Sequence, residues 1–184
     1  MDEVILASAS PRRQEILRLL RIPFTVIPAH NESVINTALS LDEAVLQVAR
    51  SKAEEVAASN PERTVIGADT VVSVGGQVLG KPKDEQQAHE MLTLLGGRGH
   101  EVITAVWVCR PGGGSGFWDC TGVEFYPLSS GEIDEYIKTG EPMDKAGGYG
   151  IQGMGLRFVR CIQGDFYTVM GLPGAKLWRF LRDM

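Results

Sequence analysis

The stretch Thr64-Val-Ile-Gly-Ala-Asp-Thr-Val-Val-Ser-Val74 decides the fold. It is apolar almost throughout, which is typical of a strand buried inside a sheet. Asp69 is the exception, because a carboxylate in such a strand is costly unless a cation meets it. Asp69 is therefore either half of a structural salt bridge or a functional group, namely a metal ligand or a general base.

The residues that follow this stretch predict a hairpin. The Gly-Gly dipeptide at 75–76 suits a two-residue turn, after which 77–79 returns along the first strand. Ideal pairing sets Thr70 opposite Lys81 and so brings Lys81 to the neighbourhood of Asp69. A proline directly after Lys81 can break the register, so the direction in which this lysine faces stays open.

The beginning of the chain predicts a strand, a short loop and a helix. Residues 4–6 are apolar, Ser10 suits the N-cap, and a proline follows it. Arg12 and Arg13 then occupy the first helical turn, where the helix dipole favours acids. Together with backbone N–H groups and the Ser8 and Ser10 hydroxyls, they make a site suited to phosphate oxygens. A solvated arginine pair is the alternative.

Two further residues stand out by their position. Lys52 falls on the apolar face of the helix expected over 41–58, so it either extends past the core to solvent or points toward phosphates. Glu32 lies in a polar loop after the strand expected at 24–27, where functional carboxylates often lie. A solvated loop acid is the alternative for Glu32.

These residues form a set that suits phosphoryl chemistry. Glu32 and Asp69 offer oxygen ligands for a hard cation such as Mg²⁺ or Mn²⁺. Asp69 could also accept the proton of a water that attacks the α-phosphorus. The cations that would neutralise a polyphosphate are Arg12, Arg13, Lys52 and Lys81.

The rest of the chain predicts helices interleaved with strands and hairpins, and hence a mixed α/β sheet packed by helices. A flexible tip is expected at 111–116 and a hairpin turn at 164–165. The further helices are expected at about 11–21, 84–96, 130–138 and from 173, and the further strands at about 100–109 and 117–126.

Composition narrows the class of protein. The chain has 184 residues, of which 43% are hydrophobic, and this predicts a single domain that spans residues 1–184. Its net charge of −5 argues against a broad nucleic-acid or membrane surface. The sequence contains no apolar run of about 18 residues and its start lacks a basic signal region, so a cytoplasmic location is expected. The three cysteines are widely spaced, and we expect them to be small buried residues rather than ligands.

Several motifs resemble, in order, those of the Maf family of nucleoside triphosphate pyrophosphatases. They are Leu6-Ala-Ser-Ala-Ser-Pro-Arg-Arg13, Gly67-Ala-Asp-Thr-Val71, Gly80-Lys-Pro82, Gly140-Glu-Pro-Met-Asp-Lys-Ala-Gly-Gly-Tyr-Gly-Ile-Gln-Gly153 and Gly171-Leu-Pro173. The segment 144–152 is similar to the branch that acts on dTTP and UTP, whereas the sister branch, which acts on 7-methyl-GTP, differs there.

The resemblance implies hydrolysis of dTTP and UTP, and of modified pyrimidine nucleotides, to the monophosphate and pyrophosphate with a divalent metal. It implies an elongated, twisted mixed sheet in two lobes around a central nucleotide cleft, similar to Maf and Ham1 proteins, and a homodimer. House-cleaning of nucleotide pools and a link to cell-division arrest are implied as well. Asn31 stands where the family often has an acid, which leaves the number of metal ligands open.

The resemblance also assigns roles to individual residues. Asp69 matches the proton acceptor, and Glu32 matches an acid near the metal. The remaining matches are Arg13, Lys52 and Lys81 to cations of the phosphate cleft, and Arg12, Thr70 and Gln152 to positions linked to nucleotide choice.

Gln152 carries a hypothesis of its own. A Gln amide has one donor and one acceptor, which match O4 and N3–H of thymine and uracil and mismatch cytosine. The alternative is that Gln152 only braces its glycine-rich loop. For the whole chain, the competing functions are a nucleotidyltransferase and a non-catalytic nucleotide-binding regulator of septum formation.

Overall fold

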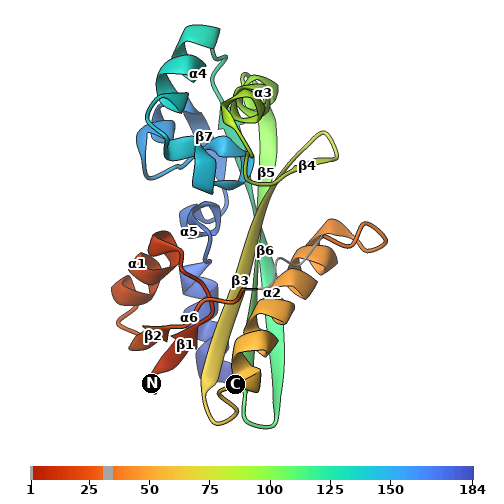
Figure 1. Cartoon of the computed structure of the whole chain (residues 1–184), viewed down its shortest axis with the longest axis vertical. Helices are drawn as coiled ribbons and strands as arrows, with labels where there is room; N and C mark the ends of the chain where they lie inside the picture. The colour runs from red at the N-terminus through yellow and green to blue at the C-terminus, as the bar shows by residue number, and fades with distance from the viewer. Residues whose placement is uncertain (1, 31–34) are drawn as a thin grey trace. The chain divides into compact units, whose positions relative to one another are not determined.

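The computed structural model describes residues 2–30 and 35–184, and these form the expected mixed α/β fold (Figure 1). In the described residues seven strands make one sheet, in the order β2-β1-β3-β5-β6-β7 with β4 paired to β3. The chain divides into two compact units. Unit 1 comprises Met1–Thr70, Thr104–Asp119 and Gly171–Met184, and unit 2 comprises Val71–Ile103 and Cys120–Met170.

Unit 1 is built around the short strand β1 (Val4–Leu6), which is entirely buried. It pairs in parallel with β2 (Phe24–Val26) on one side and with β3 (Thr64–Val74) on the other. Three helices cover the strands: α1 (Pro11–Leu19), α2 (Leu41–Ala58) and α6 (Gly174–Asp183). Helices α1 and α6 lie on one side of β3 and α2 lies on the other (Figure 1).

Helix α2 packs unusually close to β3. A Cβ atom at Gly67 would lie 2.3 Å from the Ala49 carbonyl oxygen and 2.7 Å from the Ala53 nitrogen, so only glycine fits there. The helix begins with a capping box, in which the Ser40 backbone N–H donates to Glu43 Oε2 over 3.3 Å. Its apolar residues face the core as its sequence pattern predicts.

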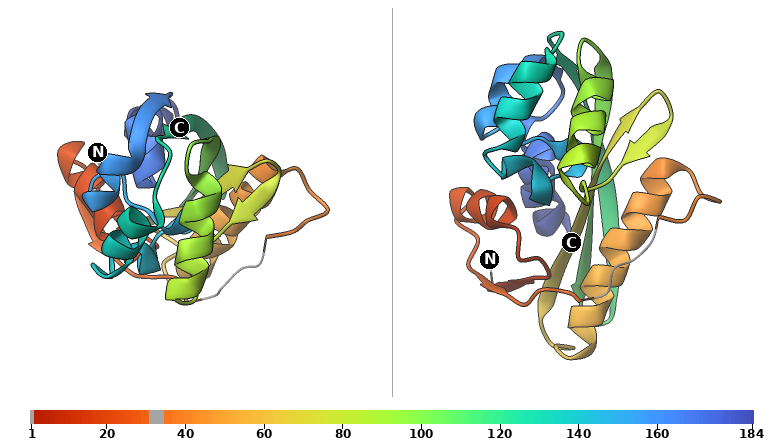
Figure 2. Two further views of the ribbon diagram at one scale, coloured as in Figure 1. Left: turned by 90° about the horizontal axis from the view of Figure 1, so that it is seen from above. Right: turned by 45° about the horizontal axis from the view of Figure 1, so that its top comes forward.

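Unit 2 contains the hairpin of β3 and β4 (Gln77–Leu79), and the antiparallel pairing of β6 (Gly113–Phe125) with β7 (Val159–Gln163). Helices α3 (Glu85–Leu95) and α4 (Ser130–Ile137) lie side by side (Figure 2). Three 3₁₀ segments follow α4, namely η1 (Glu141–Asp144), η2 (Ala146–Gly148) and η3 (Met154–Phe158).

The predicted hairpin is confirmed in part. Val74 pairs with Gln77, as expected, but the ladder ends at Val72 and Leu79. The expected pairing of Thr70 with Lys81 is therefore wrong, because the second strand stops before it reaches the proline that follows Lys81.

Two smaller predictions are also wrong, and a third is confirmed only for Cys109. The flexible tip predicted at 111–116 is a tight turn. Strand β5 (Gly99–Arg110) ends at 110 and β6 begins at 113, so only residues 111–112 connect the two strands. The predicted hairpin at 164–165 does not form. Strand β7 pairs with the earlier strand β6, and a short helix, α5 (Phe166–Met170), follows β7. Cys109 is buried, but Cys120 and Cys161 are exposed.

No helix within the described ranges combines the length and the apolar character that crossing a bilayer requires.

Candidate functional site

The Asp69 carboxylate is met by a lysine from the neighbouring helix. Lys52 Nζ on α2 lies 2.5 Å from Asp69 Oδ1 on β3, and both side chains are largely buried. This ion pair explains how β3 tolerates a carboxylate. Hairpin pairing predicted that Lys81 is the cation near Asp69. In the structure the cation bonded to Asp69 is instead Lys52, the lysine on the apolar face of α2.

Arg13 binds three separate segments of unit 1. Its Nε donates to the Gly171 carbonyl oxygen over 2.9 Å, Nη1 to Ser8 Oγ over 3.0 Å, and Nη2 to Thr70 Oγ1 over 3.2 Å. Burial lowers the pKa of Arg13, the negative charge of Asp69 acts in the opposite direction, and Arg12 adds to the lowering. The guanidinium, which stays charged, is thus fixed in a partly desolvated position where an anion is favourable.

Two residues for which the sequence predicted no role support this arrangement. Thr104 is buried on β5 and its Oγ1 lies 2.9 Å from Thr70 Oγ1. Gly171 has a φ of +111°, and a Cβ atom there would come within 3.3 Å of Thr70 Oγ1. A glycine before Leu-Pro was the available signal for Gly171, whereas nothing in the local pattern marks Thr104.

The Ser8 hydroxyl is placed to donate. Its oxygen accepts from Arg13 Nη1 and from the Ser10 backbone N–H, the latter over 3.3 Å. The hydroxyl hydrogen can therefore only bond to a further acceptor, such as a phosphate oxygen. Ser10 is the N-cap residue of α1, as predicted, but its side chain makes no capping hydrogen bond.

The first turn of α1 contains the two arginines and no acid. Arg12 and Arg13 are the second and third residues of the helix, as the sequence predicts, and both are half-buried. Backbone N–H groups and two cations at one helix terminus make this end of α1 attractive to an anion.

Asp69 and Thr70 stand together just beyond the end of β1. As neighbours in a strand they project to opposite faces, so Asp69 meets α2 whereas Thr70 meets the side of α1. Strand β1 ends at Leu6, opposite Ile66. Ligands of parallel sheets bind beyond the carboxyl ends of strands, and this position is therefore the candidate site of unit 1.

Two predicted site residues belong to unit 2. Lys81 follows β4, Gln152 follows η2, and both are exposed. Their segments are connected, because the Gly147 N–H donates to the Gly80 carbonyl oxygen over 3.0 Å.

The predicted metal ligands cannot both be placed. Glu32 lies outside the described residues. Within the described ranges, no group of three or more His, Cys, Asp or Glu side chains could hold a metal ion. The pairing of Glu32 with Asp69 around a cation stays a prediction.

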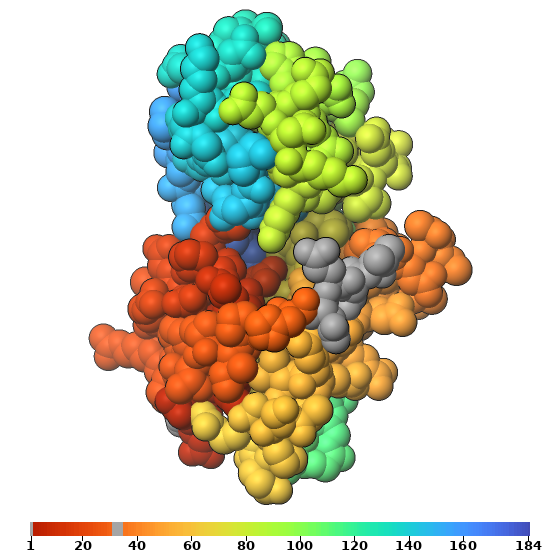
Figure 3. Space-filling model, in the orientation of Figure 1, coloured from red at the N-terminus to blue at the C-terminus, as the bar shows by residue number. Residues whose placement is uncertain are grey.

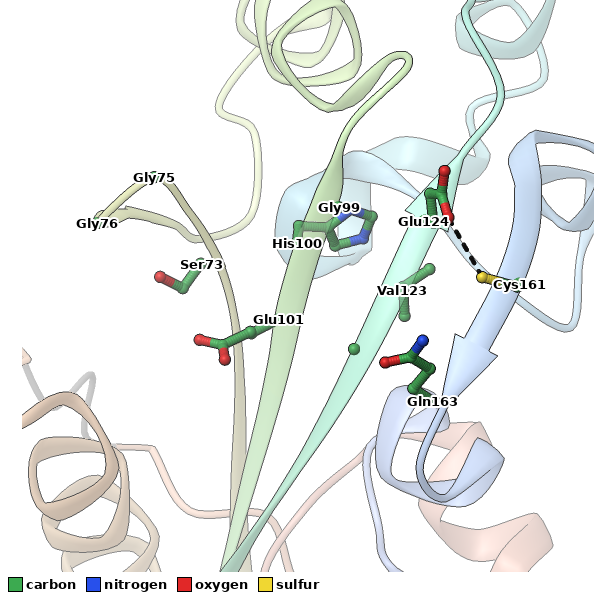
Figure 4. Close-up of a pocket in the computed structure, with 11 residues that line it drawn as sticks. Ser73, Gly75, Gly76, Gly99, His100, Glu101, Val123, Glu124, Cys161 and Gln163 are labelled. Atoms are coloured by element: carbon green, nitrogen blue, oxygen red, sulfur yellow. Dashed lines mark hydrogen bonds between the residues drawn. The ribbon is translucent and has the colours of Figure 1, made fainter.

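Unit 2 also contains a pocket of about 430 Å³ on the strands β3, β5, β6 and β7 (Figure 4). Its charged side chains are the acids Glu101 and Glu124, which do not suit a triphosphate. None of the predicted site residues that the structure describes lines this pocket. The candidate site is therefore the one beyond β1.

Comparison with known proteins gives consistent results. A family model described as Maf-like protein matches residues 3–184. A protein of Bacillus velezensis named dTTP/UTP pyrophosphatase is 51% identical over 180 residues, covering 98% of this chain and 95% of that protein. A Bacillus pumilus protein of the same name is 48% identical over 181 residues, covering 98% and 96%.

Among solved structures, the protein VC0702 from Vibrio cholerae is similar over 100% of this chain and 97% of its own, with a TM-score of 0.50 and 14% identity. That likeness concerns the fold alone. The family model, by contrast, spans nearly the whole sequence, and the curated relatives share about half of its residues. The chain belongs to the Maf family.

Proposed function

We propose that the chain is a nucleoside triphosphate pyrophosphatase that converts dTTP and UTP to the monophosphate and pyrophosphate. Its membership of the Maf family and the names of its curated relatives support this activity. The observation that carries the proposal for this chain is the Lys52–Asp69 pair at the end of β1, in the same unit as the arginines of α1.

The start of α1 would bind the phosphates. The Ser8 hydroxyl, Arg12 and the first-turn N–H groups offer donors, and Arg13 is already held by three hydrogen bonds. Donors that are fixed before substrate arrives stabilise the charge of the leaving pyrophosphate without reorganising during the reaction.

Asp69 would accept the proton of the attacking water. The water oxygen bonds to the α-phosphorus, the bond from that phosphorus to the bridging oxygen breaks, and pyrophosphate leaves with the electron pair. Lys52 orients the carboxylate in the free protein. Its flexible stem allows the ammonium to turn to phosphate oxygens when a nucleotide is bound.

A divalent cation such as Mg²⁺ or Mn²⁺ fits this chemistry. Asp69 would hold it, together with Glu32 and phosphate oxygens, since Mg²⁺ commonly takes only one or two carboxylates in phosphate sites. When bound, the cation lowers the pKa of a water ligand and neutralises phosphate charge.

The roles of Lys81 and Gln152 are part of the proposal. Lys81 would add positive charge at the phosphates, and the Gln152 amide would read O4 and N3–H of the pyrimidine. Arg12 and Thr70 would contribute to the choice of nucleotide. We also propose that the protein acts on modified pyrimidine nucleotides, forms a homodimer and is linked to septum formation.

Incubation with dTTP, Mg²⁺ and ¹⁸O-labelled water, with no acceptor present, tests the activity. We expect equal amounts of dTMP and pyrophosphate, with the label in dTMP, because water attacks the α-phosphorus. Label in pyrophosphate would contradict that attack. An absolute need for an acceptor would indicate a nucleotidyltransferase, and binding without turnover would indicate a regulator.

A further inference from the structure

The glycine-rich segment that contains Gln152 folds around the carboxylate of Glu141, a residue that the proposed chemistry does not use. Glu141 Oε1 accepts from the Tyr136 hydroxyl over 2.8 Å and from the Gly155 N–H over 3.4 Å. Oε2 accepts from the Met154 N–H over 2.9 Å. Both carboxylate oxygens are thus bonded within unit 2.

Glycines allow the segment to close on this carboxylate. A Cβ atom at Gly153 would lie 2.3 Å from Glu141 Oε1 and 2.5 Å from its Cδ. At Gly150 it would lie 2.6 Å from Lys145 Cε and 3.0 Å from Glu141 Oε1. The Glu141 carboxylate fills the volume that a side chain at Gly153 would need, and it shares the corresponding volume at Gly150 with the Lys145 side chain.

The surroundings favour a charged carboxylate. Lys145 Nζ donates to the Glu141 carbonyl oxygen over 2.6 Å and to Asp144 Oδ1 over 2.6 Å, which places a cation beside the carboxylate. Burial by itself would raise the pKa of Glu141, but the bonds from Met154, Tyr136 and Gly155, with the charge of Lys145, hold it below its usual value.

The network holds the backbone on both sides of Gln152. On one side the Gly150 N–H donates to the Tyr136 hydroxyl over 3.1 Å, and that hydroxyl donates to Glu141. On the other side the Met154 N–H donates directly to Glu141. Tyr136 is buried, whereas Gln152 is exposed between the two anchors, and the segment reaches the surface (Figure 3).

We propose that Glu141 is a positioning residue for substrate choice, whose carboxylate fixes the backbone on either side of Gln152 and thereby the direction of its amide. This inference rests on the proposed function, in which Gln152 reads the pyrimidine. A side chain with one donor and one acceptor distinguishes uracil from cytosine only while its orientation is fixed.

The variant Glu141→Gln removes the carboxylate and keeps the shape. A Gln side chain offers one oxygen and one NH₂ group, so at least one of the three donors then faces a donor. We expect kcat/KM for dTTP relative to CTP to fall by about tenfold through KM, with kcat changed less than about threefold. The control Glu90→Gln makes the same change on an exposed residue of α3 and should leave the ratio unaltered.

A second comparison separates positioning from a general structural role. In a Gln152→Ala background, Glu141→Gln should cause no further loss of discrimination, because its effect passes through the Gln152 amide. Amide hydrogen exchange should also be faster over 147–155 in Glu141→Gln than in the parent. Should Glu141→Gln fold poorly, Tyr136→Phe breaks the same anchor while retaining the buried ring.

The outcomes are distinct. An active parent whose dTTP/CTP ratio is unaltered by Glu141→Gln and by Tyr136→Phe would overturn the positioning role alone. Additive losses in the double variant would overturn it as well, because Glu141 would then act independently of Gln152. A parent without turnover of any nucleoside triphosphate would overturn the proposed function, and this inference with it.

Discussion

Asp69 and Thr70 are consecutive residues, yet their side chains bond to different helices. The Asp69 carboxylate is bonded to Lys52 of α2, whereas the Thr70 hydroxyl accepts from Arg13 of α1. The alternation of side chains along a strand is the physical cause. A single dipeptide of β3 thereby links the group proposed for proton transfer with a group proposed for phosphate binding.

The change Asp69→Asn tests the proton acceptor. Because an amide cannot take the proton, we expect kcat for dTTP to fall by about 10²- to 10⁴-fold. Binding of dTTP should persist, since Arg12 and Arg13 remain, and calorimetry can measure it. Asp183→Asn, an exposed change in α6, is the matched control. Unchanged turnover in Asp69→Asn would contradict this role.

His100 provides a pH-dependent contribution to stability. It is buried, its Nε2 lies 2.8 Å from the Tyr149 hydroxyl, and its ring meets Phe125 edge-on. Burial lowers the pKa of His100 to about 4, and the Arg98 backbone acts in the opposite direction. In the unfolded chain the pKa is about 6.5.

Between about pH 6.5 and pH 4, His100 therefore binds a proton in the unfolded chain but not in the folded chain. The contribution of His100 should be complete above pH 6.5 and be lost as the pH falls toward 4. Urea unfolding of the parent and of His100→Phe at pH 7.5 and pH 4.5 measures this. The free energy of unfolding of the parent should fall relative to that of His100→Phe between pH 7.5 and pH 4.5, and a constant difference would be evidence against a buried neutral imidazole.

At the scale of elements, the packing of α2 on β3 determines how the Lys52–Asp69 pair forms. Gly67 lets the helix approach the strand, and this close packing brings Lys52 within reach of Asp69. Helical spacing predicted the face of α2 on which Lys52 lies. The strand that this face meets depends on the tertiary fold, so the partner of Lys52 could not be predicted from spacing.

Gly67→Ala should destabilise the protein by about 1–3 kcal/mol, because a methyl group there collides with the backbone of α2 rather than with a movable side chain. Urea unfolding measures the loss. Gly131→Ala, which meets nothing within 4 Å in α4, should be neutral or slightly stabilising. Equal stabilities of the two variants would show that α2 can move away.

Glycines account for the main errors in predicting the elements. The glycines at 112–116 suggested a flexible tip, but most of them belong to β6. A Cβ atom at Gly114 would lie 2.7 Å from Trp107 Nε1, and one at Gly116 would lie 2.7 Å from Trp107 Cε3. These glycines make room for the Trp107 side chain of the neighbouring strand β5, so they serve packing rather than a flexible tip.

The candidate site was predictable in its residue types and less so in its contacts. The cation-rich start of α1 and the buried carboxylate of β3 follow from local rules of helix capping and burial. By contrast, the bonds of Arg13 to Thr70 and Gly171 join residues 57 and 158 positions apart. Thr104 and Glu141 were missed for the same reason, because their partners are set by the fold.

At the scale of the whole molecule, the chain passes between its two units four times. Three of these passages fall inside the strands β3, β5 and β6. The aromatic residues are divided between the units. All tryptophans, Trp107, Trp118 and Trp178, belong to unit 1, and all tyrosines, Tyr126, Tyr136, Tyr149 and Tyr167, belong to unit 2.

Because three strands are shared, we expect the units to unfold together. Tryptophan fluorescence and tyrosine absorbance, followed in one urea titration, report on unit 1 and unit 2 separately. Their midpoints should coincide within error, as in a two-state transition. Separate midpoints would mean that each unit is stable by itself, and would count against the predicted single domain over 1–184.

The Lys52 ammonium would have to leave Asp69 Oδ1 before this oxygen could hold the proposed magnesium ion. The displaced ammonium needs another anion, and the phosphates of a nucleotide provide one. Metal and nucleotide should therefore enter as one complex, with little affinity for the metal by itself. Until a nucleotide is bound, the Lys52 ammonium would therefore compete with the proposed metal for Asp69.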